Sequence, residues 1–160
     1  MIQFSNQEME LLELRQKVIE VVLTEIDQKI QSLEEAIDVA QKSRDMETKS
    51  TAGDKYETGR AMAQIEIDKY GSQLSEINKS KQLLNQMNTD KVLKRVTFGS
   101  LVITSDKQYL IGIGHGAVTV EGKSFFVISL ASPIGKSMLG KSSGDEVVFR
   151  GLKFKIEDLC

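Results

Sequence analysis

The feature that most constrains this chain is a pair of long apolar stripes in its first half. Aliphatic and aromatic side chains recur there at steps of three and four residues, which places them along one face of a helix. Each predicted helix has about 35 residues, or a length of roughly 50 Å, and a helix of that length is rarely stable unless it is paired. The first stripe comprises Leu11, Leu14, Val18, Val22, Ile26, Ile30, Leu33, Ile37 and Ala40, and the second comprises Ala63, Ile67, Tyr70, Leu74, Ile77, Leu84 and Met87.

A polar segment with almost no apolar residues separates the two stripes. It reads SRDMETKSTAGDKYETG, residues 43–59. A link this short permits the two helices to lie antiparallel. The sequence therefore predicts a coiled-coil hairpin over residues 1–91 with its tip near 43–59. The stretch SNQE, from Ser5 to Glu8, has the pattern of a capping box and predicts where the first helix starts.

The composition changes near residue 90, and the second half has the pattern of strands. No proline and only three glycines precede that point, whereas most of the glycines, most of the phenylalanines and the β-branched runs follow it. The segment EVVFRGLKFKIEDL predicts two strands that turn near Gly151. Its expected core residues are Val148, Leu152, Phe154 and Ile156.

One short helix is predicted between the strands, in the stretch SPIGKSMLGK. Ser132 is a good N-cap, Pro133 suits the first helical position, and Gly140 suits the C-terminal cap. The predicted fold class is therefore α+β. A helical hairpin is followed, over residues 92–160, by a small antiparallel sheet domain that carries one short helix.

Charge, hydropathy and cysteine content argue against several classes of function. The 21 Lys and Arg nearly balance the 23 Asp and Glu, so we expect neither general nucleic-acid binding nor sequence-specific DNA binding. No apolar run reaches the roughly 20 residues of a membrane helix, and the first residues lack the pattern of a signal peptide, so we expect no membrane partner. The only cysteine, Cys160, forms no internal disulfide. We expect it to be an exposed thiol in a reducing compartment, most simply the cytoplasm.

Two acidic residues follow a glycine at the predicted start of the second helix. Asp54 and Glu57 have the spacing of an N-cap residue and its N3 partner, and a charge there stabilises a helix by typically about 0.3–1 kcal/mol. Spacing alone favours capping, but an Asp that caps a helix still exposes its second oxygen to a partner.

His115, the only histidine, lies between glycines without a nucleophile motif, so we expect a turn residue rather than a catalytic base.

Three passages resemble the Gre family of bacterial transcript cleavage factors. TFGSLV at 97–102 is similar to the beginning of the family's C-terminal domain. SPIGKSMLGKSSGDEV at 132–147 is similar to the family signature of S-P-I/L, L/I-G-K and G-D, and GDKYE at 53–57 to the G-D-x-x-E of the hairpin tip. The resemblance covers nearly the whole chain and implies an FKBP-like C-terminal domain that docks on RNA polymerase near the rim of its secondary channel. The docking residues that it implies are Ser132, Pro133, Ile134, Leu139, Gly140 and Lys141.

The resemblance also implies a role for the hairpin tip. In the family the hairpin passes down the channel, where the tip acids help hold a catalytic Mg²⁺ and its water while the polymerase cleaves the backtracked 3′ end of its RNA. Those acids fall on Asp54 and Glu57. Two carboxylates are half a magnesium site at best, so we expect Mg²⁺ only in the complex with RNA polymerase and none bound tightly by the isolated protein. The protein would then be an accessory factor, not itself an enzyme, and would reach RNA only indirectly.

One stretch departs from the family pattern and motivates an alternative. After Glu57 the family usually continues N-A-E-Y, whereas this chain reads TGRAM from Thr58 to Met62, with Arg60 where the family has an acid. The alternative is a channel-binding regulator that docks without stimulating cleavage. Two others are an FKBP-like prolyl isomerase or chaperone and a plain coiled-coil assembly protein. The chain has no tryptophan to line a proline pocket, and coiled-coil assembly explains neither the tip acids nor the signature.

Overall fold

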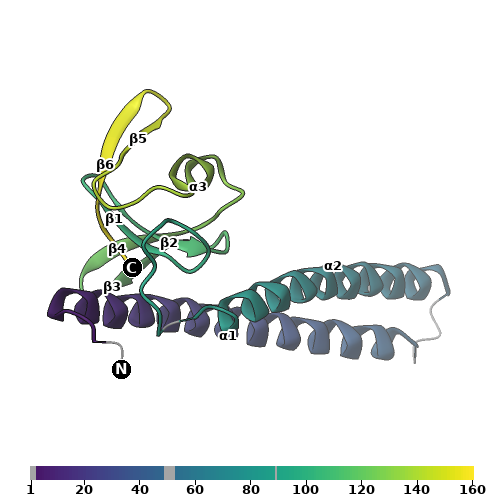
Figure 1. Cartoon of the computed structure of the whole chain (residues 1–160). Helices are drawn as coiled ribbons and strands as arrows, with labels where there is room; N and C mark the ends of the chain where they lie inside the picture. The colour runs from purple at the N-terminus through teal and green to yellow at the C-terminus, as the bar shows by residue number, and fades with distance from the viewer. Residues whose placement is uncertain (1–2, 49–52, 89) are drawn as a thin grey trace. The chain divides into compact units, whose positions relative to one another are not determined.

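A computed structural model describes residues 3–48, 53–88 and 90–160, without the side chains of residues 47, 48 and 53–56. The chain forms two compact units, whose helices and strands are labelled in Figure 1. One unit, Thr24–Gln82, is built from the two long helices. The other combines Met1–Leu23 with Leu83–Cys160 and contains the sheet.

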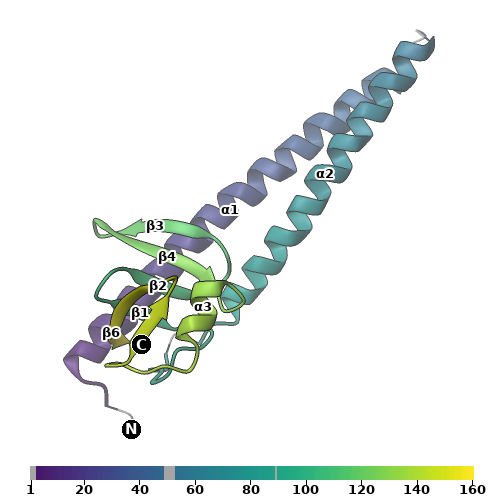
Figure 2. The same ribbon diagram turned by 90° about the horizontal axis from the view of Figure 1, so that it is seen from above.

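The two long helices confirm the predicted helical hairpin. Helix α1 (Asn6–Thr48) has 43 residues and α2 (Gly53–Asn85) has 33, and they run side by side in Figures 1 and 2. Helix α1 continues past Ala40, where its apolar stripe ends. Among the described residues, no helix combines the length and the apolarity that a membrane crossing requires.

Two polar contacts between the helices define their antiparallel register. Arg44 Nη1 donates to Gln64 Oε1 at 2.9 Å, and Lys81 Nζ lies 2.6 Å from Asp27 Oδ1. As the residue number increases along α1, the residue number of its contact on α2 decreases, so the two helices are antiparallel. Lys81 is a charged residue between Ile77 and Leu84 of the second apolar stripe. The ion pair accounts for it, because the ammonium meets a carboxylate of α1.

The predicted capping box at the start of α1 is confirmed. The Glu8 backbone N–H donates to Ser5 Oγ at 3.1 Å, and the Ser5 N–H donates to Glu8 Oε2 at 2.9 Å. The second carboxylate oxygen of Glu8 accepts from Lys94 Nζ at 2.7 Å. The Lys94 ammonium, together with the Ser5 N–H, lowers the pKa of Glu8 below its usual value. The cap thus also ties α1 to the segment that leads into the sheet.

A buried arginine holds the connector that follows α2. Arg15 is fully buried, and its Nη2 donates to the carbonyl oxygens of Asn88 at 3.2 Å and Lys91 at 2.7 Å. Burial lowers the pKa of the guanidinium, and the nearby charge of Asp90 opposes that shift. The connector is therefore attached to α1 by charge-assisted hydrogen bonds.

The sheet has six strands in the order β3-β4-β2-β1-β6-β5. All neighbours are antiparallel except β2 and β4, which run parallel, so the expectation of an antiparallel sheet is wrong for this one pair. The reason is that β3 lies at the sheet edge outside β4, so the chain enters β4 in the direction of β2. The strands are β1 (Leu101–Thr104), β2 (Gln108–Gly112), β3 (Gly116–Val120), β4 (Lys123–Ser129), β5 (Glu146–Phe149) and β6 (Leu152–Leu159).

The sheet is buried on both faces. Alternation along the strands puts Leu110 and Phe125 on one face, and both are fully buried. Val18 and Val22 of α1, in the same unit, are also fully buried. The other face packs against the short helix α3 (Pro133–Met138). Its apolar cluster is Val96, Val102, Tyr109, Ile111, Met138, Val147, Phe154 and Ile156.

The β5–β6 pair confirms the predicted hairpin but corrects part of its expected core. Phe154 and Ile156 are buried as expected, whereas Val148 is 55% exposed and Leu152 is 68% exposed. Val147 faces the core instead, since neighbouring side chains of a strand point to opposite faces. Leu152 follows directly after the turn, at the end of the hairpin.

His115 and Cys160 each had a predicted environment. His115 lies in the turn between β2 and β3, as expected, and its N–H donates to the Val127 carbonyl oxygen at 3.1 Å. Cys160 is fully buried, so the expectation of an exposed thiol is wrong. Its backbone exchanges two hydrogen bonds with Leu101, of 2.8 and 2.9 Å, which extends the β1–β6 pairing and turns the side chain inward. Burial raises the pKa of the Cys160 thiol.

Candidate functional site

The predicted tip acids lie in the first two turns of α2, which begins at Gly53. Glu57 is exposed and forms no ion pair with any other described residue. The side chain of Asp54 and the whole of residues 49–52 lie outside the described residues. Glu57 therefore presents an exposed carboxylate near the helix start, whereas a cap made by Asp54 and the convergence of the two acids stay predictions.

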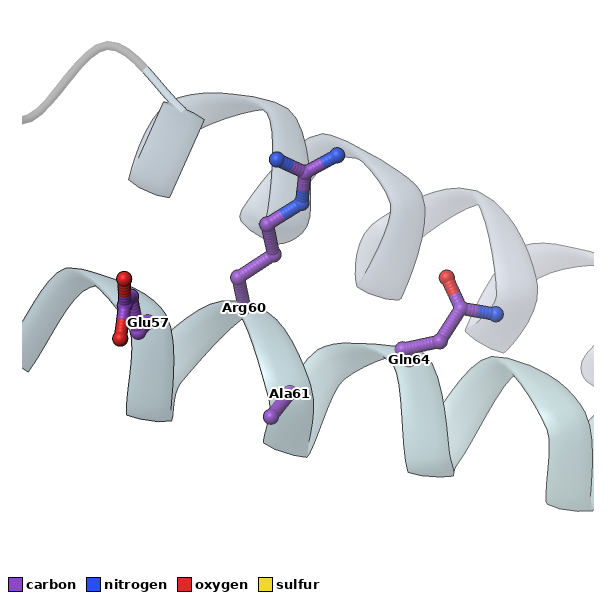
Figure 3. A pocket seen from close by; sticks show the side chains of 4 residues that line it. All are labelled: Glu57, Arg60, Ala61 and Gln64. Atoms are coloured by element: carbon purple, nitrogen blue, oxygen red, sulfur yellow. The ribbon is translucent and has the colours of Figure 1, made fainter.

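Glu57 lines a shallow surface pocket together with Arg60, Ala61 and Gln64, as Figure 3 shows. The four residues recur at steps of three and four, so they share one face of α2. Arg60 and Gln64 extend from α2 on the side of the neighbouring helix (Figure 3). The residue that departs from the family pattern, Arg60, thus belongs to the immediate surroundings of the candidate catalytic carboxylate.

A polar network crosses between the two helices beside this pocket. Gln64 accepts from Arg44 of α1 and donates through Nε2 to Asp68 Oδ1 at 2.9 Å. Arg44 Nε lies 3.6 Å from Asp45 Oδ1. The network holds the two helices in register near Glu57. Sequence reasoning placed Arg44 in a solvated link, whereas α1 extends through it, and no apolar periodicity marked that extension.

Oxygen donors of the tip suit a hard divalent cation, but the described residues supply few of them. Carboxylate oxygens are the usual protein ligands of Mg²⁺, which keeps near-octahedral coordination. Within the described part of the chain, no three side chains of metal-ligating type come together. A magnesium site at the tip would therefore need ligands beyond the Glu57 carboxylate, from Asp54 or from a partner, and it stays a prediction.

The signature segment folds as predicted around α3. Ser132 has an extended backbone and its Oγ accepts from the Gly135 N–H at 3.1 Å, Pro133 occupies the first helical turn, and Gly140 has a φ of +77° just after Leu139. The side chain of Ser132 is used inside the fold, because it also donates to the Ser129 carbonyl oxygen at 2.6 Å.

Gly135 is required by this packing. A Cβ at that position would lie 2.3 Å from the Ser129 carbonyl oxygen, which is backbone and does not move away easily. The first turn of α3 is therefore pressed directly onto the end of β4.

The six predicted docking residues lie together at α3 but differ in what they offer a partner. Ile134 packs against the apolar cluster, whereas Pro133 and Leu139 are exposed. Gly140 and Lys141 exchange backbone hydrogen bonds with Val96, of 2.9 and 2.8 Å. Of these six residues, Pro133, Leu139 and Gly140 are exposed, whereas Ser132, Ile134 and Lys141 are partly buried. Their contact with a polymerase stays a prediction.

Comparison with known proteins gives one informative match. No protein-family model matches the chain. Over 72 residues the chain is 42% identical to transcription elongation factor GreA of Maridesulfovibrio salexigens, a stretch that covers 40% of this chain and 41% of GreA. The chain therefore matches about two fifths of the length of this curated relative.

A solved structure titled "Structure of the transcription factor Gfh1" aligns over 88% of this chain and 92% of its own, with 17% identity and a TM-score of 0.33. A likeness at this score carries no argument. The GreA match points to the same family as the motifs read from the sequence. It confirms that this chain is similar to the Gre family of transcription elongation factors, as its three motifs predict.

Proposed function

We propose that this chain is a transcription elongation factor that binds RNA polymerase in the cytoplasm and stimulates cleavage of backtracked RNA. The sequence identity to GreA supports the general role. The observation that supports the cleavage activity is Glu57, an exposed carboxylate without an ion pair to another described residue, three positions after Asp54 near the start of α2.

The helical unit suits a role in reaching a recessed active site. From Thr24 to Thr48, α1 alone spans roughly 35–40 Å at 1.5 Å per residue. The paired helix α2 and the two polar contacts between the helices stiffen it. A stiff pair of helices can carry Glu57 into a channel that a globular domain does not enter.

Exposed apolar side chains near the tip fit contact with protein walls. The four exposed large apolar residues described in the Thr24–Gln82 unit all fall between positions 39 and 65, and the rest of that unit has none among its described residues. Exposed apolar groups gathered in one region commonly mark a binding surface. These residues are Val39, Met46, Met62 and Ile65.

The mechanism assigns a simple task to the tip. Asp54 and Glu57 would add carboxylate oxygens to an Mg²⁺ site that acids of the polymerase begin, and the metal would supply an activated water and stabilise the leaving oxygen. The chain would present the two carboxylates from the first two turns of α2, and the Arg44–Gln64 contact links α2 to α1 nearby. The chain itself makes and breaks no bond of the RNA.

A cleavage assay on stalled elongation complexes tests this proposal. We expect the double variant Asp54→Asn, Glu57→Gln to bind RNA polymerase normally but to lose cleavage stimulation by roughly two orders of magnitude, as for other losses of preorganised charge. Glu66→Gln is the matched control, because Glu66 is an exposed glutamate farther along the same helix. A double variant as active as the wild type would remove the proposed mechanism.

A second candidate function is a channel-binding regulator without cleavage stimulation. The observation that favours it is Arg60, whose cation shares a surface pocket with Glu57 and disfavours a divalent cation there. Normal polymerase binding without cleavage at any Mg²⁺ concentration would select this function. In that case Arg60→Glu, which restores the acid of the family pattern, is expected to gain cleavage activity.

A further inference from the structure

Two hairpins of the sheet end in the same two-residue turn. Glu121–Gly122 joins β3 to β4 with φ values of 52° and 76°, and Arg150–Gly151 joins β5 to β6 with 51° and 79°. Positive φ at both central residues is the type I′ geometry that suits strand twist. The two turns therefore have the same backbone geometry, and they differ in the side chains at and beside the turn.

The β3–β4 turn is partnered inside the protein. Glu121 Oε1 accepts from Lys17 Nζ of α1 at 2.6 Å, in the same unit. This ammonium lowers the pKa of Glu121 below its usual value. The residue before the turn, Val120, is buried. The β3–β4 end is therefore held against α1 by contacts within the protein.

Among the described residues, the β5–β6 end has no polar partner outside its own hairpin, and it presents two different faces. Cross-strand partners share a face, so Phe149 pairs with Leu152 on one face and Val148 with Lys153 on the other. Each face thus has one aliphatic side chain that is more than half exposed. Each face also has a cation, since the Arg150 guanidinium lies 5.1 Å from the centre of the Phe149 ring and Lys153 stands beside Val148.

The charge at this end is positive and little compensated. Residues 148–155 contain three basic groups and no acidic one, on a chain whose net charge is −2. Among the described residues Arg150 forms no ion pair, and Lys153 reaches Glu146 only at 3.9 Å with both side chains largely exposed. Because β5 is an edge strand, no further strand shields the end.

We propose that the β5–β6 end, defined as residues 148–153, inserts into a groove of RNA polymerase whose two walls are apolar and carry carboxylates at their rims. This inference rests on the proposed function. The cations on both faces of the end would pair with acidic groups on both walls, and the exposed aliphatic residue on each face would contact an apolar wall. Helix α3, which carries the predicted docking segment with the 52% exposed Leu139, packs against β5 in the same unit.

Protein fits this end better than nucleic acid. Single-stranded RNA is usually bound by free aromatic rings on which bases stack. The one aromatic ring here, Phe149, is partly buried and covered by Arg150, and the exposed side chains are aliphatic.

The test compares Leu152→Asp with Lys123→Asp for binding to RNA polymerase. Leu152 and Lys123 occupy the same position after the two matched turns, and both are exposed, so neither change disturbs a core. We expect Leu152→Asp to raise the dissociation constant roughly tenfold, as for a central interface residue, and Lys123→Asp to leave it near the wild-type value. Arg150→Glu is the second variant, because Glu121 shows that this turn accepts a glutamate at that position. Thermal unfolding is expected to show all three variants folded.

The outcomes separate the inference from the proposed function. If Leu152→Asp and Arg150→Glu bind the polymerase as tightly as the wild type does, the docking role of the β5–β6 end is refuted while the proposed function stands. If they lose binding to a single-stranded RNA and keep binding to the polymerase, the partner is nucleic acid and the inference is wrong. If the wild type itself fails to bind the polymerase, both fall together.

Discussion

The two units of this protein bury apolar surface in different ways. In Thr24–Gln82 only four of the described apolar residues are buried, whereas the sheet unit buries its apolar residues on both faces of the strands. Two helices share one strip of contact, and the flanking apolar positions stay half exposed. A sheet covered on both faces forms two layers of core. The four buried residues of the helical unit are Ile26, Leu33, Ala40 and Ala63.

This difference matches the proposed division of work between the units. A thin core leaves most of the helical unit as surface, which suits a part that contacts a channel and presents Glu57. The thicker core of the sheet unit can hold surface segments rigidly, and this unit carries the two proposed docking surfaces, the α3 segment and the β5–β6 end. If the comparison is correct, the same kind of core truncation should have a larger and more global effect in the sheet unit than in the helical unit.

The largest effect is expected from Phe125→Ala in the sheet. Phe125 is fully buried, so the change leaves a cavity in the thicker core and should lower the free energy of unfolding by about 3–5 kcal/mol. Chemical denaturation followed by the far-ultraviolet signal measures it. A loss below about 1 kcal/mol would mean that the site collapses around the smaller side chain.

A smaller and more local effect is expected from Leu33→Ala in the helical unit. Leu33 is 7% exposed and packs in a single strip, so we expect a loss near the lower end for such changes, about 2–3 kcal/mol. Hydrogen exchange should show faster exchange for amides within Thr24–Gln82 and unchanged protection in the strands. Equal loss of protection in both units would contradict their independence.

The smallest effect is expected from Lys81→Met, which removes the ion pair with Asp27. Both side chains are more than a third exposed, so solvent screens the pair and the loss should stay below about 1 kcal/mol. The difference between variant and wild type should shrink further at high salt. Lys79→Met, which breaks a pair within α2 itself, is the control for loss of a lysine. A gain in stability would indicate that an apolar side chain at position 81 stabilises the helix pair more than the ion pair does.

Much of the fold could be predicted from the sequence because local signals agreed with it. The apolar period predicted the hairpin, and Ser5, Glu8, Ser132 and Gly140 predicted helix ends that the hydrogen bonds confirm. The tip acids follow from a motif resemblance, and only the exposed Glu57 has a described side chain.

The sequence by itself determined which residues form helices and strands and where several of them end, because periodicity and capping act over a few neighbouring residues. Only the tertiary structure decided the parallel β2–β4 pair, the burial of Cys160 and the exposure of Val148 and Leu152. These depend on which strand lies beside which and on where the core ends. Such contacts join residues far apart in the chain, and no local pattern encodes them.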